Sequence, residues 1–104
     1  MYKKLVRDNI PNIIESNGEF AITRTLSCEE YKNELEKKLY EEYNEVLNSS
    51  KDDRIEELAD MLEVIIALAD LEGKTFGDIE KIRKLKKEKR GGFSKRIYLE
   101  DVKK

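Results

Sequence analysis

Two pairs of acidic residues have the spacing in this sequence that most suggests chemistry. Glu42 and Glu45 form the first pair, and Glu57 and Asp60 form the second. Each pair is spaced i and i+3, so both of its carboxylates would lie on one side of a helix. Like charges at this spacing destabilise a helix by about 0.2–0.5 kcal/mol per pair. Their repetition along the chain indicates a site that needs a compensating positive charge.

The residue types in the chain limit the ligand that could supply this charge. The sequence has no histidine and one cysteine, Cys28, which excludes Ser-His-Asp and Cys-His nucleophile systems and every zinc site that contains histidine. Carboxylate oxygens are ligands of hard cations. The composition therefore favours Mg²⁺, with Mn²⁺ as the alternative.

Helical periodicity places the first pair where side chains should be covered. At about 100° per residue, Glu42 falls inside the apolar arc of its helix and Glu45 at the edge of that arc. Glu41, by contrast, points outward. The arc itself consists of Tyr31, Leu35, Leu39, Tyr43 and Val46.

The second pair lies on a helix that is apolar on two sides, which predicts burial between neighbours. Glu57 and Asp60 flank the direction of Val64, on a face that we expect to be covered. Ionised carboxylates are rarely buried unless they are paired or bound to metal. The alternative is that all four residues decorate solvated helix faces, but the face positions and the repetition favour a cation site.

We expect the elements that position these residues to form a single domain, which spans residues 1–104. Ser27 with Glu30 has the spacing of a capping box, and Thr75 with Asp78 resembles a weaker one. Glycines follow three of the expected helix ends. Helices are predicted within residues 5–16, from about 28 to the turn at 48–50, from 52 or 53 to about 72, and from about 76 to the Gly91-Gly92 pair.

Two short segments, residues 20–26 and 93–99, alternate between apolar and polar side chains. This alternation is typical of strands, and the two could pair as a ribbon. The predicted fold class is therefore all-α, a helical bundle with a minor two-stranded β element.

Composition and charge exclude several classes of protein. Hydrophobic residues make up 38% and charged residues 42% of the chain, and the apolar positions keep helical periods, which predicts a folded domain. There is no apolar run of transmembrane length and no signal peptide, so we expect no membrane partner. The lone Cys28 predicts a cytoplasmic protein. Residues 81–90 are basic, but no aromatic residues interleave them and the net charge is −2, so we expect no nucleic-acid partner.

Written out, the acidic pairs are ExxE in KLYEEYNE (38–45) and ExxD in EELADMLEV (56–64). With this pattern the chain resembles the all-α nucleoside triphosphate pyrophosphohydrolases, the MazG and phosphoribosyl-ATP pyrophosphohydrolase-like superfamily. KLVRDNIPNII (4–14) and EKRGGFSKRIYLE (88–100) are similar to its small house-cleaning subgroup, so the resemblance covers nearly the whole chain. The chain departs from the pattern in the short interval of 11 residues between Glu45 and Glu57.

The resemblance implies Mg²⁺-dependent hydrolysis of a nucleoside triphosphate between its α and β phosphates, clearing non-standard nucleotides. It assigns Glu42, Glu45, Glu57 and Asp60 as metal ligands. Without histidine, a water activated by the metal is the available nucleophile, and Glu42 or Glu45 would orient it. Phosphoribosyl-ATP is an alternative substrate, and a non-catalytic, antitoxin-like helical protein is an alternative function.

Basic residues are needed to hold a triphosphate. Lys38 precedes Glu42 by one turn, and Lys89 and Arg90 precede the Gly91-Gly92 pair, whose glycines allow close approach of the backbone. Each has a structural alternative: a salt bridge to Glu42 for Lys38, and an ordinary basic helix end for Lys89 and Arg90.

At the start of the chain, Arg7 and Asp8 could contact the base or sugar, but they could equally cap a helix. The third predicted helix has more apolar surface than a domain of this size can cover. Members of the resembled superfamily associate through such helices, so we expect a homo-oligomer, with a dimer as the first expectation.

Overall fold

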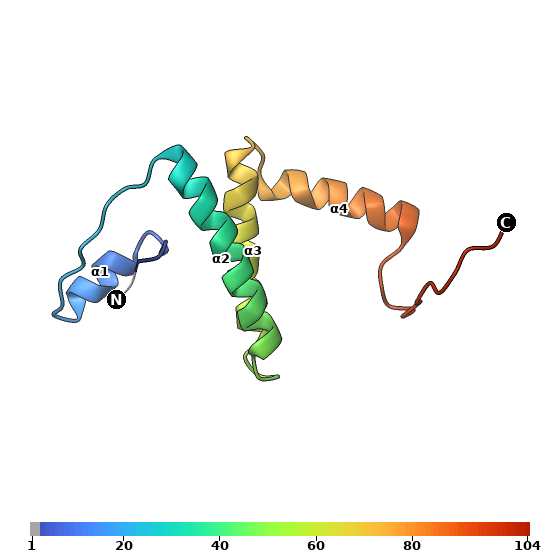
Figure 1. Ribbon diagram of the computed structural model, residues 1–104, viewed down its shortest axis with the longest axis horizontal. Coiled ribbons are helices and arrows are strands. Elements are labelled where there is room, and N and C mark those ends of the chain that lie inside the picture. Colours follow the sequence, from blue (N-terminus) through green and yellow to red (C-terminus); the bar gives the residue numbers. More distant parts are fainter. Residues whose placement is uncertain (1–2) are drawn as a thin grey trace.

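The computed structural model describes residues 3–104, and its regular structure is entirely helical (Figure 1). The prediction of an all-α fold is confirmed. The helices are α1 (Ile10–Ser16), α2 (Cys28–Asn48), α3 (Arg54–Leu71) and α4 (Phe76–Arg90).

Local sequence signals fix the starts of two helices. The backbone N–H of Glu30 donates to Ser27 Oγ over 3.2 Å, and the Ser27 N–H donates back to the Glu30 carboxylate over 3.1 Å, so α2 begins with the predicted capping box. Thr75 and Asp78 form the second box before α4. The first helix lies within its predicted range and begins at Ile10, with Asn9 at the N-cap position, but no side chain forms a capping hydrogen bond there.

The centre of the molecule is an antiparallel hairpin of α2 and α3, joined by a short polar turn (Figure 1). Its seam contains the three buried apolar side chains of the described residues, Leu35, Val46 and Val64, which are 3%, 6% and 7% exposed. Because both helices present apolar residues at helical spacing to the seam, the hairpin fixes the rotation of each helix about its axis. That rotation decides which carboxylates face one another.

The predicted two-stranded β element is absent from residues 3–104. Residues 20–26 lead from α1 to α2, while residues 93–99 follow α4, on opposite sides of the hairpin (Figure 1). Residues 20–26 have no regular structure, whereas residues 93–96 form a turn that the Arg96 N–H closes by donating to the Phe93 carbonyl. The helix α4 also carries the second segment away from the first. The prediction of two strands was therefore wrong, because alternation of side chains does not determine tertiary placement, on which strand pairing depends.

The chain does not close into a compact bundle. Its radius of gyration is 18.2 Å, whereas a compact domain of this length has about 13 Å. The helix α4 packs only near one end of α3 and then projects from the hairpin (Figure 1). The wider apolar side of α3, predicted to be buried, is therefore largely uncovered in a single chain, and Ile55, Leu58 and Leu62 on it are exposed.

The start of α2 gives a test by pH. Two bonds from Arg24 and the bond from the Ser27 N–H lower the pKa of Glu30 from 4.5 to about 2. A carboxyl whose pKa falls on folding stabilises the folded state above its unfolded pKa, and this contribution is lost as the pH falls. The difference in Tm between wild type and Glu30→Gln should be complete at pH 7 and shrink between pH 4.5 and 2, as measured by circular dichroism.

Glu29→Gln, in the same helical turn, is the matched control, because Arg24 bonds Glu30 and not Glu29. A Tm difference for Glu30→Gln that stays constant over the whole pH range would contradict this account of the helix start.

Candidate metal centre

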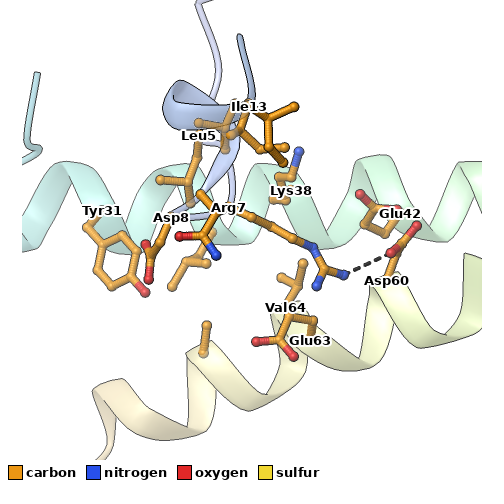
Figure 2. Close-up of a pocket in the computed structure, with 15 residues that line it drawn as sticks. Leu5, Arg7, Asp8, Ile13, Tyr31, Lys38, Glu42, Asp60, Glu63 and Val64 are labelled. Carbon is orange, nitrogen blue, oxygen red and sulfur yellow. Dashed lines mark hydrogen bonds and ion pairs between the residues drawn. The ribbon is translucent and has the colours of Figure 1, made fainter. Parts of the chain in front are cut away.

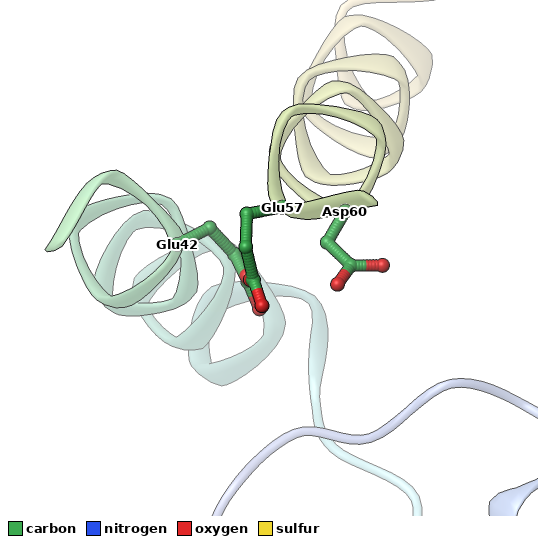
Figure 3. A group of neighbouring side chains, drawn as sticks. All are labelled: Glu42, Glu57 and Asp60. Carbon is green, nitrogen blue, oxygen red and sulfur yellow. The ribbon is translucent and has the colours of Figure 1, made fainter. Parts of the chain in front are cut away.

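Three carboxylates converge where α2 faces α3. Glu42 comes from α2, and Glu57 and Asp60 come from successive turns of α3 (Figure 3). One oxygen of each lies within 4.8 Å of the others. The hairpin seam causes this convergence, because the rotation that buries Val64 and Leu35 also turns these acidic positions toward the facing helix.

The fourth predicted ligand, Glu45, lies outside this group of three. Its side chain is exposed, although its charge still acts on Glu57 and raises the pKa of that residue. Glu41 is also exposed, as its position on the helix predicted. The structure thus brings three of the four sequence-predicted ligands together and leaves Glu45 beside them.

The convergence has an electrostatic cost. Partial burial is the main cause that raises the pKa of Glu42, and the charges of Asp60 and Glu57 raise it further. Loss of hydration is also the first cause that raises the pKa of Glu57, followed by the charges of Asp60 and Glu45. Both carboxyls therefore hold their protons more strongly than usual, as expected where negative charges crowd.

Two basic side chains lie close to the carboxylates. Arg7 reaches from the segment before α1 and donates from Nη2 to Asp60 Oδ1 over 2.8 Å (Figure 2). Lys38 lies 3.8 Å from Glu41, and its charge lowers the pKa of Glu42. The predicted alternative of a salt bridge for Lys38 is thus seen with Glu41 in place of Glu42.

A cleft of about 430 Å³ opens between the N-terminal segment and the hairpin. This is within the range of about 300–1,000 Å³ that is typical of small-molecule sites. Its lining combines acidic, basic and apolar side chains, and Figure 2 shows how Arg7 crosses it toward Asp60. The lining includes the predicted residues Arg7, Asp8, Lys38, Glu42 and Asp60, and the apolar residues Leu5, Val6, Ile10, Ile13 and Ala67.

The other predicted phosphate ligands, Lys89 and Arg90, are the last two residues of α4. The helix leads them away from the hairpin (Figure 1). Within one chain they do not join the carboxylates or the cleft.

Two polar side chains of the cleft were missed by sequence reasoning. Tyr31 and Glu63 line the cleft, but neither was expected there, and periodicity assigned Tyr31 to the apolar arc of its helix. The direct bond from Arg7 to Asp60 joins residues 53 positions apart, and no local pattern carries that information.

The donor set fits a hard divalent cation. All three converging ligands are carboxylates, half-buried and close enough to share one ion. Oxygen-only ligands suit Mg²⁺ or Mn²⁺, and Mg²⁺ typically takes one or two carboxylates together with water and phosphate oxygens. A single unit charge from Arg7 does not neutralise three carboxylates.

Searches against protein-family models, curated proteins and solved structures found no match for this chain. None of the helices in residues 3–104 is both long and apolar enough to cross a membrane.

The raised pKa of Glu57 gives a prediction about stability. A carboxylate whose pKa rises on folding destabilises the folded state once the pH exceeds that pKa. In EDTA at pH 7, Glu57→Gln should therefore have a higher Tm than wild type, and this advantage should vanish as the pH falls through the carboxyl range. Addition of Mg²⁺ should then raise the Tm of wild type more than that of the variant.

Glu15→Gln, an exposed substitution on α1, is the control and should change little under either condition. A Tm of Glu57→Gln below that of wild type in EDTA at pH 7 would contradict the repulsion described here.

Proposed function

We propose that this protein is a Mg²⁺-dependent nucleoside triphosphate pyrophosphohydrolase, which cleaves between the α and β phosphates to give a monophosphate and pyrophosphate. The observation that supports it best is the convergence of Glu42, Glu57 and Asp60 within 4.8 Å beside a cleft of about 430 Å³. The resemblance of the ExxE and ExxD segments points to the same reaction, and the all-α fold is compatible with it.

The three converging carboxylates would hold the cation. When bound, a divalent cation neutralises phosphate charge and makes a water molecule more nucleophilic. Glu45 lies next to this group without belonging to it, and its exposed carboxylate is free to accept a hydrogen bond from water. We therefore assign the orientation of the attacking water to Glu45 in preference to Glu42.

The cleft lining includes groups suited to both parts of a nucleotide. Arg7 and Lys38 lie at the carboxylate end, where phosphates would need positive charge. Leu5, Val6 and Ile13 provide an apolar surface for the base and sugar. A lining that combines charge with apolar surface suits a nucleoside triphosphate better than inorganic polyphosphate, which has no apolar part.

The direct test is an assay of pyrophosphate release over a panel of natural and damaged triphosphates and phosphoribosyl-ATP, with Mg²⁺ or with EDTA. Activity should require the metal. Asp60→Asn and Glu57→Gln should each lower kcat/KM by at least about 100-fold, because even residues outside the ligand shell of metal sites cost about 10–100-fold when changed. Glu41→Gln, next to Glu42 on α2 but exposed, is the matched control and should retain activity.

Equal activity in EDTA, or no turnover of any compound in the panel, would overturn this proposal. The second result would favour a non-catalytic helical protein, in which the acidic residues serve only to bind a partner.

We further propose that two copies associate through the hairpin. Helix geometry places Tyr43 and Leu47 of α2 on the same side as Leu58 and Leu62 of α3, away from Asp60, and all four are exposed. Nearby Ile55 is 75% exposed. Exposed apolar side chains of this kind on a chain with so small a core favour association with a second copy.

Leu62→Glu tests this association, because a charge on the apolar face cannot be desolvated cheaply. Wild type should have twice the 12.2 kDa mass of one chain in size-exclusion chromatography with light scattering, and the variant should shift toward 12.2 kDa. Lys37→Glu, on the polar side of α2, should leave the mass unchanged. A wild-type mass of 12.2 kDa would refute the dimer while leaving the proposed reaction untouched.

A further inference from the structure

The ion pair between Arg7 and Asp60 occupies an oxygen that the proposed metal centre needs. Arg7 Nη2 lies 2.8 Å from Asp60 Oδ1, and Asp60 is one of the three carboxylates that converge within 4.8 Å. The contact joins the N-terminal segment to α3, and Figure 2 shows the guanidinium lying across the cleft between them. Arg7 is therefore the cation that already partners this cluster.

A guanidinium and a divalent cation cannot both sit against Asp60 without repulsion. Each is attracted by the same carboxylates, and they would lie only a few ångströms apart, where like charges in a watery setting still interact by about 1 RT or more. Arg7 is free to leave, since its side chain is 57% exposed and the contact is a single bond to one oxygen. Exposed pairs of this kind are weak.

Once released, Arg7 would still lie in the cleft. Its planar fork of donors matches two phosphate oxygens at once, which a lysine cannot do. Lys38 is less able to change partners, because its side chain is only 18% exposed and lies beside Glu41. Arg7 is thus the basic group of the cleft best able to change partners between the carboxylate cluster and a phosphate.

We infer that Arg7 is a displaceable counterion that couples cation binding to phosphate binding at this site. Before a divalent cation is bound, Arg7 forms an ion pair with Asp60. When the cation binds Asp60, this ion pair breaks, and the Arg7 guanidinium then binds phosphate oxygens of the substrate. This inference rests on the proposed metal centre. It makes Arg7 a positioning residue whose removal should affect the two ligands in opposite directions, since the cation loses a competitor and the phosphate loses a partner.

The experiment titrates Mn²⁺ alone into the protein and follows free Mn²⁺ by electron paramagnetic resonance. Arg7→Gln should bind Mn²⁺ about three- to tenfold more tightly than wild type, the size expected when one nearby unit charge is removed. Inorganic tripolyphosphate, titrated calorimetrically at saturating Mg²⁺, should bind the variant at least about tenfold more weakly, because a charged hydrogen bond is lost.

Arg24→Gln is a closely matched control. Arg24 also forms a 2.8 Å ion pair with a glutamate, Glu30, at similar exposure, but that glutamate is not among the converging carboxylates. Both affinities should stay at wild-type values in this variant. A merely structural role for Arg7 would weaken the binding of both ligands together and lower the Tm, and this outcome would overturn the inference.

Unchanged or weaker Mn²⁺ binding by Arg7→Gln would also overturn it. A wild-type protein that binds no Mn²⁺ would refute the metal centre itself, and with it this inference, so the two failures are distinguishable. Should Arg7→Gln fail to fold, nuclear magnetic resonance of the wild-type arginine side chains replaces it. Mg²⁺ should then shift the Arg7 Nε–Hε signal and leave that of Arg24 in place, and an unmoved Arg7 signal would contradict the displacement.

Discussion

The repulsion among carboxylates at the contact between α2 and α3 is the constraint on which the rest of this structure depends. Glu42, Glu57 and Asp60 approach one another because the helices must bury Leu35, Val46 and Val64 in their seam. The free energy gained by that burial holds the charges together. Loss of hydration, and after it the neighbouring negative charges, raise the pKa values of Glu42 and Glu57. A cation that binds these carboxylates in the folded state therefore stabilises the folded protein.

Two of the surrounding elements place positively charged side chains near the three carboxylates. The N-terminal segment carries Arg7 to Asp60, and α2 places Lys38 within range of Glu42. Between them lies a cleft with room for a small molecule. Because the cluster and the cleft share residues, a ligand with phosphates at one end and an apolar group at the other fits both, which is why hydrolysis of a nucleotide is the function that we propose.

Much of the fold could be predicted from sequence because its determinants are local. The capping box of Ser27 and Glu30 sets the start of α2, and helical periodicity separated Glu42 from the solvated Glu41. The predicted β element failed because the pairing of residues 20–26 with 93–99 depends on where α4 points, which no local signal determines. The bond between Arg7 and Asp60 could not be predicted from the sequence for the same reason, because it depends on how the N-terminal segment crosses the hairpin.

In a single chain, α4 projects from the hairpin and one apolar side of α3 is exposed. Periodicity correctly found an apolar side through Leu58 and Leu62, but the chain does not cover it. Lys89 and Arg90, predicted to hold phosphate, lie at the far end of α4. Both departures are explained most simply if the functional unit contains more than one copy, which is how we interpret them.

The central claim is that the three carboxylates form a metal centre, and anomalous diffraction at the manganese edge tests it most directly. Crystals of the wild-type protein would be grown with Mn²⁺ and a non-hydrolysable nucleoside triphosphate. The account predicts an anomalous peak bonded to oxygens of Glu42, Glu57 and Asp60 and to phosphate oxygens in the adjoining cleft. Absence of the peak at these carboxylates, with the nucleotide bound elsewhere or not at all, would contradict it.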